Sequence, residues 1–249
     1  MDIPPFFFSI NILCLLLFLC VSVVKLFSAV NYNEVMAEAY SMIRQCLKPT
    51  CRFRFPVVGE NLDVTACPKC GSPTRLVESP YSGLKVEAQT TRPTGPVLQA
   101  LLDNIRSSFN VGAMFRTADG AGVTHLHLCG ITPAPDHPKV AKTALGAEYS
   151  VPWTQYWDAI EAATSLKKGG FEVWALEGGP RSESIFSASK ELPEKPLLLV
   201  VGNEVSGVDP GLLELCQRVV CIPMQGAKQS LNVAVAFGIA VYTLRSPLL

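Results

Sequence analysis

The stretch that decides the fold of this chain runs from Ile222 to Asn232 and reads IPMQGAKQSLN. An apolar segment, Arg218 to Ile222, precedes it and is expected to form a strand that ends at Pro223. After the loop, Ser230 is expected to cap an apolar helix that runs to Leu244, because serine is a favoured N-cap residue. The pattern predicts a polar loop held between a buried strand and a buried helix, where α/β folds place ligands.

The overall composition sets limits on the class of protein. The 249 residues suffice for one α/β domain and a small additional module. Because 21 basic residues balance 21 acidic ones, bulk charge gives no sign of nucleic-acid binding, and any basic patch must be local. The nine cysteines are not spaced like the disulfide framework of a small secreted domain, which favours a reducing compartment.

Residues 1–41 form an apolar N-terminal segment, in which Pro5 to Phe27 is long enough to cross a bilayer as a helix. Basic residues follow this run, which favours a membrane anchor with the body of the protein in the cytoplasm. The alternative is a mis-assigned start, with Met36 or Met42 as the true first residue. Both interpretations predict a cytoplasmic location for the main domain. Residues Asn31 to Leu47 are expected to extend as an amphipathic helix.

Four cysteines within residues 42–78 are spaced as in a zinc ribbon. Cys46 and Cys51 form the first pair, and Cys67 and Cys70 form a Cys-x-x-Cys-Gly pair. Zn²⁺ binds four thiolates tetrahedrally, and each pair on a tight turn can direct both sulfurs toward one ion. The spacing predicts a structural zinc site, because a segment this short has no core of its own. The alternatives are four unconnected thiols or a ribbon that has lost its function.

The same module is basic and aromatic. Its cationic and aromatic residues include Arg52, Phe53, Arg54, Phe55, Lys69 and Arg75. This composition suits contact with RNA, and the alternative is a solvated face with phenylalanines that pack on the ribbon. Residues 79–96 are rich in Pro, Ser, Thr and Gly without apolar periodicity, which indicates a linker.

Residues 97–249 alternate between expected strands and helices, which predicts a parallel sheet with helices on both faces. The expected strands are 97–105, 125–130, 171–176, 197–202 and 218–222, and the expected helices are 110–121, 138–145, 155–168, a short helix from 210 and the helix that ends near 244. Asn110 is expected to cap the first of these helices. His125 and His127 share a strand face without an acidic partner nearby, which favours a structural role.

Three polar loops follow strands of this domain: Asn104–Arg116, Gly202–Gly207 and Met224–Asn232. In a parallel sheet such loops gather at one edge. The chain contains no Ser/His/Asp set, Walker loop or carboxylate pair, and Asn203-Glu204 replaces the second glycine of a dinucleotide fingerprint. The residues alone predict a small-molecule-binding α/β enzyme with a polar pocket rich in Arg, Asn and Glu.

At these loops the chain resembles the SpoU (TrmH) family of RNA ribose 2'-O-methyltransferases, in the SPOUT superfamily. The resemblance covers residues 97–249 and rests on Asn110-x-Gly112-x-x-x-Arg116, on Gly202-x-Glu204-x-x-Gly207, and on Ile222-Pro223-Met224 with Ser230-Leu231-Asn232. It implies a C-terminal trefoil knot, a homodimer with parts of each site completed by the partner, and methyl transfer from S-adenosylmethionine to a ribose 2'-hydroxyl of tRNA or rRNA.

The resemblance also implies roles for individual residues. Those implied to bind the cofactor are Gly202, Glu204, Gly207, Ile222, Met224, Ser230 and Leu231, and those implied in catalysis are Arg116, Asn110, Glu204, Ser230 and Asn232. The family's arginine is described as the general base, but arginine hardly deprotonates in a protein, so Arg116 fits better as a phosphate clamp or as a stabiliser of the developing alkoxide. Asn110 would orient Arg116 or the RNA backbone, and Glu204 would cap backbone amides or fix Asn232.

Two other functions are consistent with the sequence. A non-catalytic RNA-binding protein would use the knot domain and the zinc module for recognition only. A membrane-tethered regulator would use the zinc module for protein contacts. The presence of Arg116 and of the complete third loop favours the enzyme.

Overall fold

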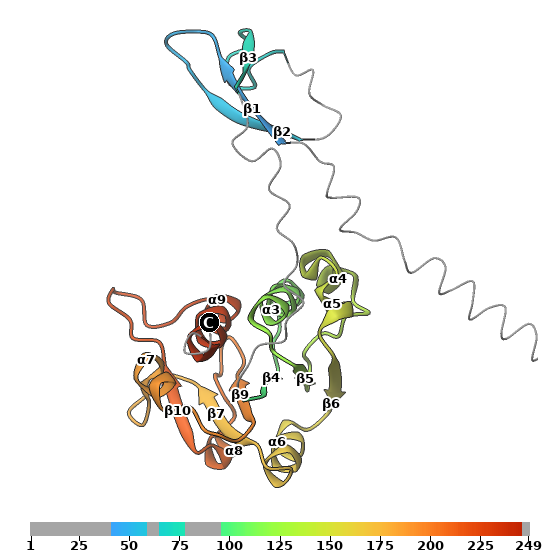
Figure 1. Cartoon of the computed structure of the whole chain (residues 1–249), viewed down its shortest axis with the longest axis vertical. Coiled ribbons are helices and arrows are strands. Elements are labelled where there is room, and N and C mark those ends of the chain that lie inside the picture. The colour runs from blue at the N-terminus through green and yellow to red at the C-terminus, as the bar shows by residue number, and fades with distance from the viewer. Residues whose placement is uncertain (1–40, 59–64, 78–95, 246–249) are drawn as a thin grey trace, which may run out of the picture. The chain divides into compact units, whose positions relative to one another are not determined.

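The computed structural model describes residues 41–58, 65–77 and 96–245 (Figure 1). These residues belong to two compact units, which divide between Ala88 and Gln89. The apolar run from Pro5 to Phe27 and almost all of the expected linker lie outside the described residues. In the part of the chain that the structure describes, no helix is long and apolar enough to cross a bilayer.

The first unit is a three-stranded antiparallel sheet in the order β2-β1-β3. Its strands are β1 (Ser41–Cys46), β2 (Arg54–Val58) and β3 (Thr74–Val77). The helix predicted for Asn31–Leu47 is therefore wrong over residues 41–46, since this backbone pairs with two neighbouring strands instead of with itself. The remainder, residues 31–40, lies outside the described residues.

The second unit contains a seven-stranded sheet in the order β6-β5-β4-β9-β7-β10-β8, in which every pair is parallel. The strands are β4 (Leu98–Asp103), β5 (His125–Cys129), β6 (Trp153–Tyr156), β7 (Glu172–Leu176), β8 (Glu183–Ser184), β9 (Leu197–Val201) and β10 (Arg218–Cys221). All five residues of β9 are buried, as its continuous apolar run predicts for a strand covered on both faces. The predicted parallel α/β sheet is confirmed.

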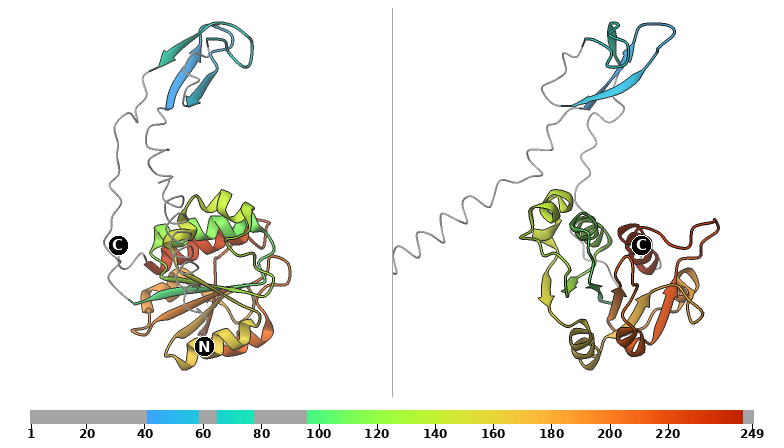
Figure 2. Two further views of the ribbon diagram at one scale, coloured as in Figure 1. Left: turned by 90° about the vertical axis from the view of Figure 1, so that its right-hand side faces the viewer. Right: turned by 180° about the vertical axis from the view of Figure 1, so that it is seen from behind.

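Helices cover both faces of this sheet (Figures 1 and 2). They are α3 (Ser108–Ala121), α4 (Pro138–Ala144), α5 (Ala147–Ser150), α6 (Ala159–Lys168), α7 (Ile185–Ala188), the 3₁₀ turn η2 (Ser189–Glu191), α8 (Pro210–Leu215) and α9 (Val233–Arg245). Helices α3, α4 and α9 lie on one face, and α6 and α8 lie on the other. Two apolar cores result, one on each face of the sheet.

Helices α3 and α9 begin at residues other than those predicted. Helix α3 is capped by Ser107, whose hydroxyl accepts a hydrogen bond from the N–H of Asn110 at 3.3 Å. Asn110 therefore lies in the first turn and is not the cap. Helix α9 is capped by Asn232 and not by Ser230, because the Asn232 side-chain oxygen accepts the N–H groups of residues 234 and 235 at 2.9 and 3.3 Å. The first correction leaves the Asn110 side chain available for contacts between loops, and the second leaves only the amide group of Asn232 available for them.

The helix predicted from Gln155 begins later, at Ala159. Residues Trp153–Tyr156 form the edge strand β6, which pairs with β5. The carboxylate of Asp158 then caps α6 by accepting the N–H groups of Ile160 and Glu161 at 2.8 and 3.0 Å. The aspartate cap outweighs the weak helical periodicity of the preceding residues.

Gly112 determines how closely α4 packs against α3. A Cβ atom at this position would overlap the Thr143 side chain and the Val140 carbonyl. The glycine of the first polar loop therefore serves helix packing, which fixes the position of the α3 start beside the sheet edge.

Candidate active site

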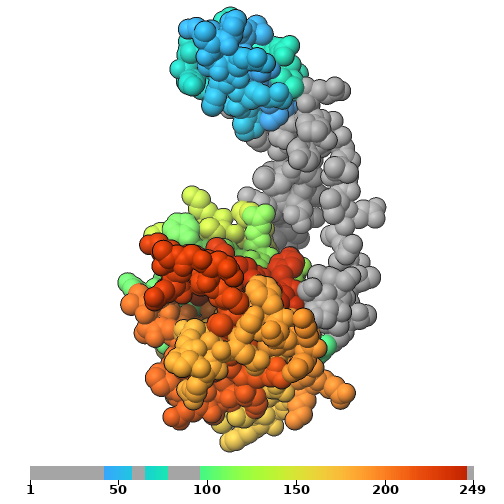
Figure 3. All heavy atoms as spheres, turned by 90° about the vertical axis from the view of Figure 1, so that its left-hand side faces the viewer, coloured from blue at the N-terminus to red at the C-terminus, as the bar shows by residue number. Residues whose placement is uncertain are grey.

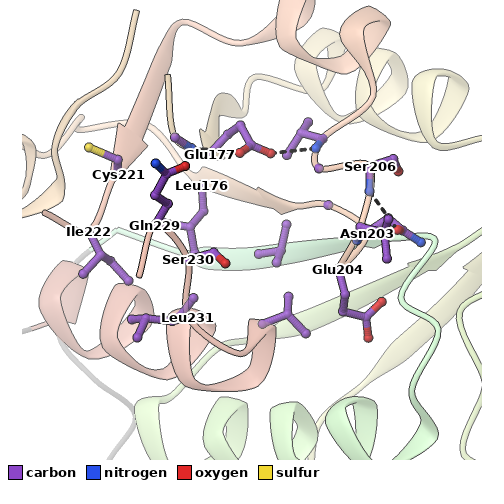
Figure 4. Close-up of a pocket in the computed structure, with 18 of the residues that line it drawn as sticks. Leu176, Glu177, Asn203, Glu204, Ser206, Cys221, Ile222, Gln229, Ser230 and Leu231 are labelled. Atoms are coloured by element: carbon purple, nitrogen blue, oxygen red, sulfur yellow. Dashed lines mark hydrogen bonds between the residues drawn. The ribbon is translucent and has the colours of Figure 1, made fainter. Parts of the chain in front are cut away.

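The three predicted loops meet at the carboxyl edge of the sheet, after strands β4, β9 and β10 (Figure 4). The loop Gly202–Gly207 is closed by two backbone hydrogen bonds of 3.0 Å between Asn203 and Gly207. Gly207 has a φ of 75°, and a Cβ atom at Gly202 would overlap the backbone of residues 207 and 208. Only glycine fits these two positions without distortion.

Glu204 connects this loop to the start of α3. Its carboxylate accepts the backbone N–H of Arg106 at 2.9 Å and of Ser107 at 3.2 Å. It also accepts the Asn110 side-chain amide at 3.0 Å. Partial burial raises the pKa of Glu204, but the donated hydrogen bonds outweigh it, and the net pKa lies below the ordinary value for glutamate. Glu204 is therefore an anionic cap at the positive end of a helix.

Asn110 and Asn232 extend this network to the third loop. The Asn110 side-chain oxygen accepts the Asn232 amide at 3.2 Å, while its own amide donates to Glu204. The orientation of the Asn110 amide is fixed by these two bonds. Of the alternatives for Glu204, capping of backbone amides is what the structure shows, whereas Asn232 is held by Asn110.

The second and third loops, together with residues after β7, line an open pocket of about 680 Å³, and the first loop adjoins it through Glu204. Every residue predicted to bind a cofactor lines it: Gly202, Glu204, Gly207, Ile222, Met224, Ser230 and Leu231. The Ser230 hydroxyl points into the pocket (Figure 4). In the space-filling view, gold, orange and red segments make up most of the visible face of the unit, and green segments border it (Figure 3).

Arg116 lies elsewhere on α3. It is exposed and is not among the pocket-lining residues, and no described residue forms a hydrogen bond or an ion pair with its side chain. It shares a helix face with Gly112, four residues earlier, and that face contacts α4. The structure thus joins Asn110 to Glu204 and Asn232, and it does not join Asn110 to Arg116.

Glu177 is a pocket residue that sequence reasoning missed. It follows β7, the neighbour of β9, and its carboxylate accepts the N–H of Val208 at 2.8 Å and of Gly178 at 2.9 Å (Figure 4). It therefore holds the end of the Gly202–Gly207 loop in place. A glutamate directly after a buried strand was the available signal, because parallel strands end at one edge.

The described lining has a distinct charge. It contains Glu177 and Glu204 but no lysine, arginine or histidine. Apolar side chains, among them Leu176, Ile222 and Leu231, supply much of the remaining surface. Such a lining favours a ligand that has an apolar ring and a positive charge, and it disfavours phosphate groups.

The first unit contains the four clustered cysteines. The Sγ atoms of Cys46, Cys51, Cys67 and Cys70 all lie within 4.8 Å of one another. The Cys46–Cys70 and Cys51–Cys67 sulfur pairs are 3.6 and 3.9 Å apart, and all four thiols are free of disulfides. The two cysteine pairs of the sequence therefore place their four sulfur atoms in one cluster, as the ribbon pattern predicts.

A family model described as the SpoU rRNA Methylase family matches residues 98–242, more than half of the chain. The chain belongs to this family. Among curated SpoU relatives, the 23S rRNA (guanosine(2553)-2'-O)-methyltransferase RlmP of Bacillus subtilis is 34% identical over 148 residues, which are 58% of this chain and 56% of the relative. The tRNA (guanosine(18)-2'-O)-methyltransferase of Aquifex aeolicus is 33% identical over 144 residues, 56% of this chain and 64% of the relative. The chain thus spans less than two thirds of the length of either curated relative.

Solved SpoU-like structures agree with the observed fold. The AdoMet-bound rRNA methyltransferase from Sinorhizobium meliloti is 27% identical with a TM-score of 0.57, and the match covers 64% of this chain and 59% of that one. The TrmH/SpoU tRNA modifying enzyme of A. aeolicus is 30% identical with a TM-score of 0.54, over 60% of this chain and 74% of that one.

Proposed function

We propose that this chain transfers a methyl group from S-adenosylmethionine to a ribose 2'-hydroxyl of tRNA or rRNA. The observation that carries the proposal is the network of Glu204, Asn110 and Asn232 beside a pocket lined by all the predicted cofactor residues. Family membership supports the reaction class, since similar curated proteins are named as 2'-O-methyltransferases of rRNA or tRNA.

The pocket residues fit S-adenosylmethionine. A volume of about 680 Å³ is suitable for a ligand of this size. The apolar side chains of Leu176, Ile222 and Leu231 suit an adenine ring, and the carboxylates of Glu177 and Glu204 suit a positively charged sulfonium. The absence of cations from the described lining disfavours a dinucleotide or a nucleoside triphosphate as the ligand.

When bound, this cofactor supplies an already electrophilic methyl group, so the protein has to place the ribose hydroxyl in line and assist loss of its proton. Glu204 is poorly suited as the base, because three hydrogen-bond donors and a lowered pKa keep it an anion. We assign Glu204 the role of fixing the α3 start and Asn110, while Asn110 and Asn232 hold the two pocket loops together. Ser230 lines the pocket as a hydrogen-bonding group.

Arg116 acts on the RNA side in this proposal. Its guanidinium remains charged at physiological pH and is exposed on α3, so it can bind the phosphate next to the target ribose and stabilise the developing alkoxide. The phosphate or a water molecule then takes the proton. A homodimer in which the partner completes the RNA side would explain why Arg116 is separate from the pocket lining of one subunit. Light scattering tests this state, with an expected mass of twice 26.9 kDa.

We also propose the C-terminal trefoil knot that the family resemblance implies. The segment from Met224 to Asn232 passes beside the loop from Gly202 to Gly207, and both line the same pocket. Asn232 and Glu204, on these two segments, are joined through Asn110. This close association of segments supports a threaded arrangement.

RNA would approach along the carboxyl edge between β4 and β6. The N–H of Gly130 donates to the carbonyl of Tyr156 at 2.9 Å, so Ile131 and Trp157 each lie one residue beyond this bond, at neighbouring strand ends. These two residues are 66% and 89% exposed. Because neighbouring strands are about 4.8 Å apart, Trp157 lies about 10 Å along the edge from the end of β4, within reach of a nucleotide that flanks the target. We propose that this nucleotide's base stacks on Trp157.

We propose that the first unit is a structural zinc ribbon. Four sulfurs that surround one Zn²⁺ at about 2.3 Å in a tetrahedron are about 3.8 Å apart. The Cys46–Cys70 and Cys51–Cys67 sulfur pairs, at 3.6 and 3.9 Å, agree with this geometry. The N–H of Gly71 donates to the Cys67 carbonyl at 2.8 Å, and Gly71 has a φ of 69°, so the second turn has the backbone that a metal-binding knuckle needs.

Label transfer from S-adenosylmethionine to total tRNA or rRNA tests the main proposal. The wild-type protein should yield labelled 2'-O-methylnucleosides after nuclease digestion, and Arg116→Ala should reduce the rate at least about 100-fold with unchanged cofactor affinity. Lys168→Ala, which removes an exposed cation at the end of α6, is the matched control. RNA binding by wild type without label transfer, or undiminished transfer by Arg116→Ala, would contradict the catalytic assignment.

A further inference from the structure

The charges of the chain are distributed unevenly between its two units. Residues 41–58 and 65–77 contain six charged side chains, and all are positive: Arg44, Lys48, Arg52, Arg54, Lys69 and Arg75. Residues 96–245 contain 12 basic and 14 acidic residues. Four thiolates and one Zn²⁺ would contribute two negative charges, so the described part of the ribbon keeps about four positive charges. Residues 42–78 as a whole also contain Glu60, Asp63 and Glu78, so the module is only slightly basic, and its described cations form a local basic patch.

We propose that this ribbon binds single-stranded RNA, through phosphate contacts to its arginines and stacking of an unpaired base on Phe53. The inference rests on the proposed function, because it takes the substrate to be RNA. It adds a second RNA-binding surface, separate from the carboxyl edge of the catalytic sheet.

The sheet register places arginines on one face of the ribbon. Arg54 on β2 and Arg75 on β3 both lie opposite Gln45 of the central strand, so their side chains share a face. Arg75 donates to the buried Gln45 side chain at 3.1 Å, which fixes its position, and Arg54 is exposed. Arg52, also exposed, lies two residues before Arg54. Arginines held in this way can contact phosphates of one strand.

The aromatic residues lie on the opposite face of β2. The rings of Phe53 and Phe55 are stacked with centroids 5.8 Å apart and planes at 20°. Phe53 is 39% exposed, so part of its ring is open to a base, while Phe55 packs behind it. Because β2 is an edge strand, one RNA strand that crosses its outer edge can reach Arg54 on one face and the exposed part of the Phe53 ring on the other. Stacking requires an unstacked base, which favours single-stranded over duplex RNA.

The test is binding of a fluorescent 20-nucleotide oligouridylate to the zinc-loaded full chain over a range of salt concentrations. Arg52→Gln/Arg54→Gln removes two phosphate contacts. Because each contact contributes about 0.7 to the salt slope of a single strand, we expect a slope less steep by about 1.4 and binding about 25-fold weaker at 0.1 M salt. Phe53→Leu should weaken binding at least about fivefold without changing the slope. Zinc content of about one equivalent in each variant shows that the ribbon is intact.

Lys168→Gln/Lys195→Gln is the matched control, because it removes two exposed cations at the opposite, amino edge of the catalytic sheet. Binding by the arginine variant equal to that of the control would overturn the inference. Displacement of the oligonucleotide by poly-glutamate at equal charge concentration would also overturn it, in favour of an acidic protein partner. If the wild-type protein binds the oligonucleotide through its arginines but transfers no methyl group, the proposed function is refuted and this inference is retained.

Discussion

Replacement of Glu204 by glutamine tests the network at its centre, because the variant keeps the shape and removes the charge. The Oε1 atom accepts two hydrogen bonds, and Oε2 accepts the Arg106 N–H at 2.9 Å. If the amide oxygen of glutamine takes the Oε1 position, its NH₂ group faces the Arg106 N–H, and two donors meet. The substitution therefore removes at least one charge-assisted hydrogen bond and the favourable interaction with the α3 N-terminus.

The magnitude follows from these losses. A hydrogen bond to a charged group contributes about 1.5–3 kcal/mol, which we reduce to about 1 kcal/mol because Glu204 is exposed to solvent. The helix-terminus interaction adds about 0.5 kcal/mol. A loss of about 1.5 kcal/mol corresponds to a melting temperature lower by about 3–6 °C for the catalytic unit. Methyl transfer should fall at least about 10-fold, because the two facing donors at Arg106 displace the side chain that orients Asn110.

Thermal denaturation at several pH values is the assay, and Glu214→Gln on the exposed face of α8 is the control. The pKa of Glu204 is lowered in the folded protein, so its stabilising effect is present above the ordinary value of 4.5 and is lost as pH falls through the folded pKa. The difference in melting temperature between wild type and Glu204→Gln should therefore have its full value at pH 7 and decrease below about pH 4.5. A variant as stable as the control at pH 7 would refute the reasoning.

Three further predictions concern other parts of the chain. Trp157→Ala should raise the KM for RNA about 10-fold and leave cofactor affinity unchanged in calorimetry, because it removes only a stacking surface; an unchanged KM would exclude the stacking role. Burial lowers the pKa of His127 to about 4, so the free energy of unfolding, measured with denaturant, should fall by up to about 3 kcal/mol as the pH drops from about 6.5 to 4. The variant His127→Gln should not show this pH dependence. A wild-type protein without it would contradict the lowered pKa. Zinc chelation or Cys67→Ser should abolish the cooperative unfolding of the proposed ribbon, because the metal would hold this unit together; unchanged unfolding of the ribbon would contradict a structural zinc.

The sequence predicts the catalytic sheet well, because buried parallel strands carry continuous apolar runs. Leu197–Val201 is the clearest case, with every residue buried. Prediction was wrong for Ser41–Cys46, where pairing with β2 and β3 outweighs the helical pattern of the segment. It was also wrong for the start of α6, where a strand precedes the Asp158 cap.

For the site, the family resemblance identifies the candidate residues but does not predict which of them contact one another. Glu204 and Asn110 are 94 residues apart in the chain, and Asn110 and Asn232 are 122 apart. Local sequence patterns contain no information about hydrogen bonds between residues so far apart in the chain. Serine and asparagine are both favoured helix N-caps, so residue type alone does not distinguish Ser230 from Asn232 as the cap of α9. The role of Arg116 stays a prediction, because its RNA-side contacts require the substrate.

The charge of the pocket lining has a consequence for turnover. In the proposed reaction, Glu177 and Glu204 in a described lining without lysine, arginine or histidine attract a positively charged methyl donor more strongly than the neutral thioether that remains after transfer. The charge of the lining would then favour replacement of the demethylated product by the methylated cofactor. In the proposed reaction, Glu177 therefore affects product inhibition as well as the position of the loop. The substitution Glu177→Gln should reduce the ratio of the affinity for the charged cofactor to the affinity for its neutral product.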